Sequence, residues 1–303
     1  MNNEVLVSCT VLSYNSSATI VETLESIKAQ TYQNIELIVS DDCSKDDTLV
    51  VCRDWIRHNK DRFVRVELLT VEKNAGVCAN GNRARKACKG EWIKGIAADD
   101  ILMDDCIEKN MDFIKEHPEA SFIASCMSVY NNSFIQKNCV EEKKAPWNVD
   151  VFLQPRELQL KKMAFCSYIY APATFYRRSL FEKVGGYNTQ FGYEDWPFYM
   201  SVLEHGYRID YLDKVTVCYR IHQSLSHTRG KLFNYDLSRK TRVFIKEKCY
   251  KYYTWKQLLA TNLLYSVESF LYYLHLDKDT TITRFVYKKI TNLAIRLGWF
   301  SIK

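Results

Sequence analysis

Along the first hundred residues, segments with apolar residues at strand-like spacing alternate with segments that have them at helical spacing. Apolar residues occupy alternate positions over 5–11, which predicts a strand, and recur at helical spacing over 20–27, which predicts a helix. The succession continues with expected strands at 35–39, 66–70 and 90–96 and with expected helices at 49–59 and 80–89. Strands that alternate with helices of this length predict an α/β fold with a doubly wound, mostly parallel, Rossmann-like sheet.

The pattern is less regular in the rest of the chain. A helical pattern over 104–117 ends before Pro118, and an apolar run predicts a strand over 121–130. Residues 131–156 are polar and predict a long connection. The later pattern predicts a short helix over 178–184, a helix that follows 191–198, strands over 207–212 and 215–220, and helices over 232–248, 254–276 and 282–297.

Composition and charge divide the chain into two regions. The 303 residues are 47% hydrophobic and 26% charged, which suits a globular protein with a sizeable core. The net charge is +6, but residues 231–303 contain 14 Lys and Arg against 5 Asp and Glu. The tail therefore carries +9 and residues 1–230 carry −3, which predicts two regions with different surfaces.

The basic tail is also rich in aromatic residues, and its predicted helices are interrupted by charges too often to span a bilayer. Basic amphipathic helices of this kind suit peripheral contact with an anionic membrane surface. The alternatives are packing on the rest of the protein or on a second subunit, as in a homo-oligomer. No nucleic-acid recognition motif is present, so we expect no nucleic-acid partner.

The amino terminus and the cysteines favour a cytoplasmic protein. Residues 1–4 lack the basic flank and apolar core of a signal peptide. The eleven cysteines include no Cys-Xaa-Xaa-Cys pair, which fits reduced thiols better than a disulfide frame or a zinc site. We therefore expect a cytoplasmic location, at the inner face of the membrane if the tail binds lipid.

The apolar strand at 90–96 ends in two adjacent carboxylates, Asp99 and Asp100. In an open α/β sheet, ligands bind just outside the carboxyl ends of the strands, so both acids are expected at such a site. Two neighbouring carboxylates repel each other unless a cation lies between them, which favours a divalent metal. A solvated turn or a helix cap is the alternative. The sequence contains neither the dinucleotide-binding motif Gly-Xaa-Gly-Xaa-Xaa-Gly nor the phosphate-binding motif Gly-Lys-Ser/Thr. We therefore expect a metal to bind the phosphates of a nucleotide.

Five short motifs occur in a characteristic order. They are Thr10-Val11-Leu12-Ser13-Tyr14-Asn15, Ile38-Val39-Ser40-Asp41-Asp42-Cys43-Ser44 with Asp47-Thr48, Asn74-Xaa-Gly76-Val77, Gly90-Glu91-Trp92-Ile93 and Ala98-Asp99-Asp100. In order and spacing this series resembles glycosyltransferase family 2, whose members have the GT-A fold. The resemblance covers roughly residues 4–228. It implies an inverting enzyme that uses a nucleotide-diphosphate sugar, with UDP-sugar as the expected donor.

The resemblance also implies roles for individual residues. Leu12, Tyr14, Asp42 and Asn82 would bind the nucleotide sugar, and Asp99 would bind both the donor and Mn²⁺ or Mg²⁺. Asp100 would be a second metal ligand. The sequence departs from the family at two positions, because Ala97 replaces the first acid of Asp-Xaa-Asp and Gly81 stands where many relatives carry Arg.

Downstream, the run Phe191-Gly192-Tyr193-Glu194-Asp195-Trp196-Pro197-Phe198 also resembles the family. The resemblance implies that Asp195 is the catalytic base that takes the proton of the acceptor hydroxyl, with Glu194 orienting it. The alternative is a helix cap, because an acid just before Pro197 favours the start of a helix.

A second downstream run, Tyr219 to Ser226, resembles the end of the family's catalytic domain, where a His or Arg reaches the diphosphate or the metal. His222 is the candidate metal ligand, and a structural histidine is the alternative.

We therefore predict a catalytic domain over 1–228, with a nucleotide-sugar half over 1–103 and an acceptor half over 104–228, followed by a basic helical region over 229–303. The expected reaction is transfer of a sugar to a hydroxyl of a polysaccharide or of a lipid-linked oligosaccharide. Two other classes stay open at this point. One is a sugar nucleotidyltransferase, and the other is a non-catalytic glycan-binding or scaffold protein on the same fold.

Overall fold

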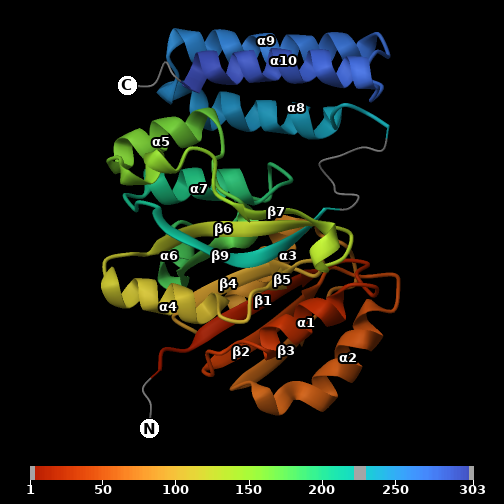
Figure 1. The fold of residues 1–303 in the computed structure, drawn as a ribbon, viewed down its shortest axis with the longest axis vertical. Helices are drawn as coiled ribbons and strands as arrows, with labels where there is room; N and C mark the ends of the chain where they lie inside the picture. The colour runs from red at the N-terminus through yellow and green to blue at the C-terminus, as the bar shows by residue number, and fades with distance from the viewer. Residues whose placement is uncertain (1–3, 222–229, 300–303) are drawn as a thin grey trace.

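The structure is a computed structural model that describes residues 4–221 and 230–299 (Figure 1). Its centre is a mixed sheet in which six strands run in one direction and β8, β5 and β7 run against them. The strand order is β3 (Arg65–Leu69), β2 (Ile35–Asp41), β1 (Val7–Ser13), β4 (Trp92–Ala97), β8 (Thr174–Arg177), β6 (Phe122–Asn131), β9 (Asp210–Ile221) and β5 (Ile101–Leu102), with β7 (Cys139–Lys144) paired to β6. The predicted mostly parallel α/β sheet is confirmed.

Helices cover both faces of this sheet, and each face has its own apolar core. Helices α1 (Ile20–Lys28), α2 (Thr48–Asn59) and α4 (Cys106–Glu116) pack on one face through residues such as Leu24, Trp55 and Ile107. The other face is covered by α3 (Val77–Ala87), α5 (Arg156–Phe165), α6 (Arg178–Lys183) and α7 (Asp195–Glu204). Strands buried on both faces read as apolar runs, which is why β2 and β4 were predictable, whereas β1 was predictable from its alternating apolar positions.

The middle of the chain differs from the prediction in two places. The two strands expected over 207–212 and 215–220 are a single strand, β9, which stays paired with β6 across a bulge near Cys126. Asp213 and Lys214 interrupt the apolar pattern there because both are exposed at the bulge. The connection expected over 131–156 is also more ordered than predicted, since it contains the charged edge strand β7 and leads directly into α5.

The three predicted tail helices are present as α8 (Tyr235–Phe244), α9 (Trp255–Tyr273) and α10 (Thr281–Trp299). They form a helical layer at one end of the molecule, next to α5 and α7 (Figure 1). The ring of Phe244 lies 5.1 Å from that of Phe191 and 5.3 Å from that of Trp196, centroid to centroid. At the other end of the layer, Gly298 lies so close to the ring of Phe165 that no room remains for a Cβ atom. The layer therefore packs on the acceptor half of the protein.

The structure also shows the state of the cysteines and the hydropathy of the helices. All eleven cysteines are unpaired, and nine of them are buried. Over residues 4–221 and 230–299, no helix combines the length and the hydropathy that crossing a membrane requires.

Candidate active site

The ends of β1, β2 and β4 meet at one edge of the sheet, as the motif order predicts. β1 lies between the other two strands, and its register places Leu12 opposite Ala97 and Ser13 opposite Asp41. Beyond the strands, the N–H of Asp42 donates to the carbonyl of Ser13 at 3.0 Å, and the N–H of Ala98 donates to that of Leu12 at 3.0 Å. The polar segments that follow the three strands are therefore neighbours in space.

Asp42 holds the loop that precedes α3. Its buried carboxylate accepts hydrogen bonds from the N–H groups of Ala75 at 3.1 Å and Gly76 at 2.7 Å. Arg83 forms an ion pair with the same carboxylate at 3.4 Å. Gly76 has φ of +86°, in the left-handed region that glycine adopts without a steric cost. The side chain of Asp42 thus fixes the backbone of this loop at the sheet edge.

Tyr14 lies on the turn between β1 and α1, with 48% of its surface exposed. Cross-loop bonds hold this turn, because the N–H of Asn15 donates to Ser44 Oγ at 2.8 Å and the N–H of Lys45 donates to Asn15 Oδ1 at 2.8 Å. An exposed aromatic ring on a fixed turn can stack on a planar ligand.

The turn that carries Asp99 and Asp100 is fixed from α1. Thr19 Oγ1 donates to the carbonyl of Ala98 at 2.8 Å, and Thr23 Oγ1 donates to that of Asp100 at 2.7 Å. Asp99 is partly exposed, whereas only 3% of Asp100 is exposed. Burial, and then the charge of Asp99, raise the pKa of Asp100 to about 8. The two adjacent acids therefore have different surroundings, and Asp99 is the more accessible.

Asp99 and Asp100 suit a divalent cation that is bound jointly by protein carboxylates and the phosphates of a substrate. Among the described residues, no group of three or more His, Cys, Asp and Glu side chains could hold a metal ion by itself. Mg²⁺ is usually bound by one or two carboxylates, with substrate phosphates and waters completing its shell. An accessible Asp99 beside Asp100 meets that requirement. His222, the other predicted ligand, lies outside the described residues.

Arg220 links the end of β9 to this turn, and the sequence analysis did not single it out. Its Nε donates to the carbonyl of Asp99 at 2.7 Å, and its backbone N–H donates to Asp100 Oδ1 at 2.8 Å. The guanidinium also bonds the carboxylate of Glu22 and the carbonyl of Asn132, and it lies 4.2 Å from the centre of the Phe134 ring. The signal in the sequence is its place in the run Tyr219 to Ser226, where the family resemblance implies a His or Arg near the diphosphate or the metal, but only His222 is named there as a candidate.

Glu194 is the N-cap residue of α7, and Asp195 is its first residue. The N–H of Trp196 donates to Asp195 Oδ1 at 2.7 Å. Burial raises the pKa of Asp195, and burial together with the charge of Asp195 raises the pKa of Glu194 to about 7. Burial and the charges of both acids raise the pKa of Cys78, at the start of α3, to about 12. Cys78 follows Gly76 by two positions, so the acid pair lies near the loop that Asp42 holds.

Asn82 connects α3 to the segment that leads to these acids. Its Nδ2 donates to the carbonyl of Tyr187 at 2.9 Å, and its Oδ1 accepts from the N–H of Tyr187 at 2.8 Å. Gly186, at φ of +71°, allows the close approach, because a Cβ atom there would lie 2.8 Å from Asn82 Oδ1. Both polar atoms of the Asn82 amide are thus bonded to the backbone of the acceptor half.

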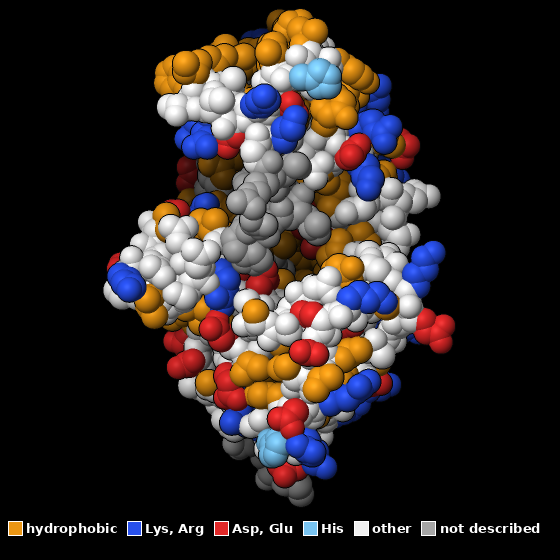
Figure 2. Space-filling model, turned by 90° about the vertical axis from the view of Figure 1, so that its right-hand side faces the viewer, with side chains coloured by type: hydrophobic (Ala, Val, Ile, Leu, Met, Phe, Trp, Pro, Cys, Tyr) orange, Lys and Arg blue, Asp and Glu red, His pale blue; other side chains and the backbone are white. Residues whose placement is uncertain are grey.

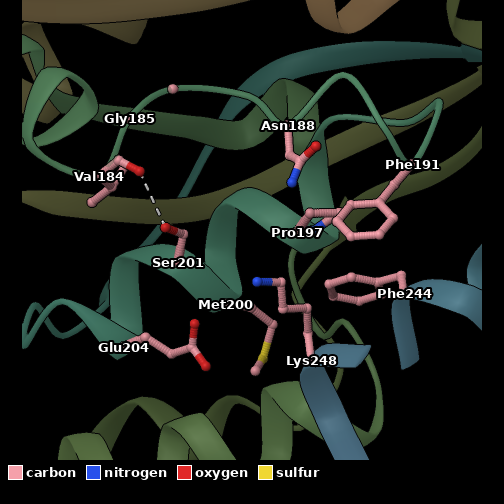
Figure 3. A pocket seen from close by; sticks show the side chains of 11 residues that line it. Val184, Gly185, Asn188, Phe191, Pro197, Met200, Ser201, Glu204, Phe244 and Lys248 are labelled. Atoms are coloured by element: carbon pink, nitrogen blue, oxygen red, sulfur yellow. Dashed lines mark hydrogen bonds between the residues drawn. The ribbon is translucent and has the colours of Figure 1, made fainter. Parts of the chain in front are cut away.

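A cavity of about 220 Å³ lies between the turn after α6, the helix α7 and the tail, and Gly186 and Pro197 are among its lining residues (Figure 3). None of the candidate residues lines it. Its carboxylate, Glu204, accepts a hydrogen bond from the Tyr252 hydroxyl at 2.8 Å and forms an ion pair with Lys251 at 2.9 Å. We therefore assign the candidate active site to the sheet edge.

The sequence model described as "Glycosyl transferase family 2" matches residues 8–185. The chain belongs to glycosyltransferase family 2. The predicted family and its enzyme class are thereby confirmed, and this family 2 enzyme is a glycosyltransferase.

Two curated bacterial relatives match 66% and 72% of the chain. An uncharacterized glycosyltransferase of Haemophilus influenzae is 28% identical over 204 residues, which cover 66% of this chain and 62% of that protein. The Escherichia coli protein WfaP is 28% identical over 221 residues, which cover 72% of this chain and 78% of that protein. WfaP is named as a UDP-Glc:alpha-D-GlcNAc-diphosphoundecaprenol beta-1,3-glucosyltransferase.

Solved structures support the GT-A fold. Residues 1–349 of TarS from S. aureus, solved in complex with UDP-GlcNAc, superpose with a TM-score of 0.59 at 21% identity, over 80% of this chain and 66% of that one. A mannosyltransferase from Pyrobaculum calidifontis, PcManGT, solved with GDP-Man and Mn²⁺, gives a TM-score of 0.61 at 17% identity, over 100% of this chain and 87% of that one. At these identities the likeness concerns the fold.

Proposed function

We propose that this enzyme transfers a sugar from a nucleotide-diphosphate donor, with UDP-sugar favoured, to a hydroxyl of a glycan acceptor, with inversion at the anomeric carbon. The observation that carries the proposal is that the acid pair Glu194 and Asp195 lies near the start of α3, next to the loop that Asp42 holds at the sheet edge, and that the pKa values of both acids are raised. A donor site and a general base are the two parts that a single displacement requires.

In this proposal Leu12, Tyr14 and Asp42 form the nucleoside subsite. The exposed ring of Tyr14 offers a stacking surface for the base. Asp42 contributes by holding the Ala75–Gly76 backbone in place rather than by presenting a free carboxylate, because that carboxylate already accepts two N–H groups and an arginine. Asn82 acts at a distance from the donor, by fixing Tyr187 and the segment before the acids.

Asp99, with Asp100 and His222, would hold Mn²⁺ or Mg²⁺. Such a cation neutralises charge on the departing diphosphate as a Lewis acid. Mn²⁺ accompanies the donor in the PcManGT complex.

Asp195 is the general base of the proposed reaction. The acceptor oxygen forms a bond to the anomeric carbon while the bond from that carbon to the diphosphate oxygen breaks, and the hydroxyl proton passes to Asp195. A carboxylate with a raised pKa accepts a proton more readily, which favours this role. Glu194, whose pKa is raised to about 7, would orient the acceptor through a hydrogen bond.

The acceptor that we favour is a lipid-linked oligosaccharide. WfaP and a second Escherichia coli relative, WfgD, which is 32% identical over 146 residues, are both named for an acceptor linked to diphosphoundecaprenol. We propose residues 1–228 as the catalytic unit, with residues 229–303 as a helical addition. Eleven unpaired cysteines suit a reducing compartment, which supports a cytoplasmic location.

The test is a panel of UDP-, GDP- and dTDP-sugars, incubated with diphospholipid-linked glycans in the presence and absence of Mn²⁺. We expect one donor to release nucleoside diphosphate in step with glycan extension, with an anomeric configuration opposite to that of the donor. Release of pyrophosphate would identify a nucleotidyltransferase instead. Donor binding without release or extension would identify a non-catalytic protein.

A further inference from the structure

The tail carries most of the large hydrophobic side chains that the described part of the protein exposes. Of 23 such side chains, 14 lie between residues 231 and 299. Eight of them surround the turn between α9 and α10, and we refer to this group as the α9–α10 tip: Phe270, Tyr272, Tyr273, Leu274, Leu276, Ile282, Phe285 and Val286. Hydrophobic side chains gather over α9 and α10 at the upper end of the molecule in Figure 2.

The tip residues are exposed although both helices, α9 and α10, already pack one face against the protein core. Ala260 of α9 and Ala294 of α10 are buried in the same core as Phe244, so each helix already covers an apolar inner face. The tip residues lie on the remaining, outer surface, where Ile282 is 77% and Tyr273 is 70% exposed. An apolar group of this size on a surface marks an interaction site.

The charges around the tip are positive. Its two acids are engaged, because Asp277 is buried in an ion pair with Lys231 at 2.6 Å and Asp279 pairs with Arg284 at 2.8 Å. Lys278, Lys288 and Lys289 are exposed, and within residues 4–221 and 230–299 no carboxylate forms an ion pair with them. The tip therefore presents apolar and aromatic side chains together with uncompensated cations.

The tip lies on the side of the molecule where the parallel strands end. The N–H of Leu232 donates to the carbonyl of Asp277 at 2.9 Å, and the N–H of Asp279 donates to that of Gly230 at 2.9 Å. Gly230 follows Ile221, the last residue of β9, by only nine positions. In Figure 1 the chain leaves β9 on the right and the C-terminus lies on the left, so α9 turns into α10 on the strand-end side. Figure 2 views this side, with the tail above and the sheet-end loops below.

We propose that the α9–α10 tip docks on an anionic lipid membrane. Aromatic side chains favour the boundary between headgroups and acyl chains, and lysines beside them are attracted to acidic lipids. A second copy of the chain fits less well, because a symmetric contact would bring Lys278, Lys288 and Lys289 against their own counterparts. Docking would bring the strand-end side to the lipid surface. Only that last consequence, access to a lipid-linked acceptor, rests on the proposed function.

The experiment is sedimentation of the full chain with vesicles of phosphatidylcholine alone and with vesicles that also contain phosphatidylglycerol. We expect binding to the mixed vesicles that weakens as salt is added. Ile282→Glu combined with Phe285→Glu should reduce this binding about tenfold or more, because both side chains lose their insertion into lipid. The matched control is Val50→Glu combined with Val64→Glu, in which side chains of similar exposure on the nucleotide half are replaced. This control should bind as wild type does.

A second pair of variants tests the charges. Lys288→Glu with Lys289→Glu should weaken binding to mixed vesicles, whereas Lys60→Glu with Lys86→Glu, which changes the net charge equally, should have a much smaller effect. Equal binding by the tip variants and wild type would overturn the proposal. A concentration-dependent dimer that the tip variants abolish would overturn it in favour of a second copy.

Donor-dependent nucleotide release with a water-soluble acceptor is measured on the same variants. Unchanged release in tip variants that no longer bind vesicles separates membrane docking from the transfer reaction. If no nucleotide sugar supports release, the proposed function fails, while the vesicle measurement still decides the docking proposal.

Discussion

Arg220 and Asp100 are joined by a hydrogen bond of 2.8 Å, from the backbone N–H of the arginine to the carboxylate of the acid, across 120 positions of sequence. The guanidinium of the same arginine donates to the carbonyl of Asp99 at 2.7 Å. The end of β9 therefore sets the conformation of the turn that carries the proposed metal ligands. The family match ends at residue 185, so this constraint comes from a segment beyond it.

Replacement of Arg220 should therefore affect both stability and donor use. Only 8% of Arg220 is exposed, and Arg220→Ala leaves the carbonyls of Asp99 and Asn132 without their donor. We expect the free energy of unfolding to fall by about 2–4 kcal/mol. Denaturant unfolding measures the change. Arg57→Ala, which removes an exposed ion pair with Asp54, should change it by about 0.5 kcal/mol or less, and a similar small effect of Arg220→Ala would refute the role.

The conformation of the loop before α3 should depend on the carboxylate of Asp42. Asp42→Ala removes the acceptor of the N–H groups of Ala75 and Gly76 and leaves Arg83 without its ion-pair partner. We expect a loss of about 1–3 kcal/mol of stability, together with faster amide hydrogen exchange at 75–80. The KM for the donor should rise more than kcat falls, because the loop is proposed to position the nucleoside. Asp54→Ala, at an exposed acid, is the control, and unchanged exchange at 75–80 would contradict the assignment.

The fold of the nucleotide half was predictable because its signals are local. β2 and β4 are buried and appear as short apolar runs between polar turns, and β1 appears as alternating apolar positions. β9 was split in the prediction because Asp213 and Lys214 interrupt its apolar pattern, and only its pairing with β6 shows that the strand continues through a bulge. The helix α5 was not predicted, although Leu160 and Met163 are buried at helical spacing. The polar segment before it gives no signal of where the helix begins.

The sequence names candidate site residues but not their contacts. Motif order singles out Asp42, Asp99 and Asp195 as candidates through the family resemblance. It does not reveal that Asp42 bonds backbone N–H groups, or that Asn82 bonds Tyr187, which lies 105 positions away. Such contacts depend on how the two halves pack, and no local pattern encodes them. The same reason explains why Arg220, whose partners lie on α1, on the Asp99 turn and after β6, was not singled out.

The proposed metal site predicts a specific dependence on Asp99. In wild type, Mn²⁺ should tighten binding of the accepted UDP-sugar, and removal of the ion with a chelator should abolish the gain. Asp99→Asn should lose about tenfold or more of this metal-dependent gain, because an amide is a weaker ligand than a carboxylate. Thermal stabilisation by donor and metal together gives the measurement independently of turnover. Asp112→Asn, at an exposed acid on α4, is the control, and full metal response in Asp99→Asn would exclude Asp99 as a ligand.

Asp195→Asn should reduce kcat by about 10²–10⁴-fold while the protein stays folded, because the amide cannot accept the acceptor's proton. Donor binding should change little, since Asp195 is proposed to act on the acceptor. Asp236→Asn, at an exposed acid in the first turn of α8, is the matched control. Transfer at the wild-type rate by a folded Asp195→Asn variant would remove it as the base.

The acid pair also predicts how activity and stability change with pH. Because burial raises the pKa of Asp195 and because Glu194 titrates at about 7, transfer should decline as pH falls through the range in which the pair takes up protons. Glu194→Gln removes the neighbouring negative charge and should move the midpoint of this decline to lower pH.

The contribution of Glu194 to stability should increase as pH falls, whereas transfer should decline. A carboxyl whose pKa is raised from 4.5 in the unfolded chain to about 7 in the folded protein binds its proton more tightly when folded. Its contribution is fully present below pH 4.5 and is lost as pH rises toward 7. The free energy of unfolding of wild type should therefore fall between these pH values relative to that of Glu194→Gln, in which this titration is absent. Denaturant unfolding of both proteins from pH 4.5 to 8 measures the difference, and parallel pH profiles would show that Glu194 titrates normally and is not held in the buried environment described above.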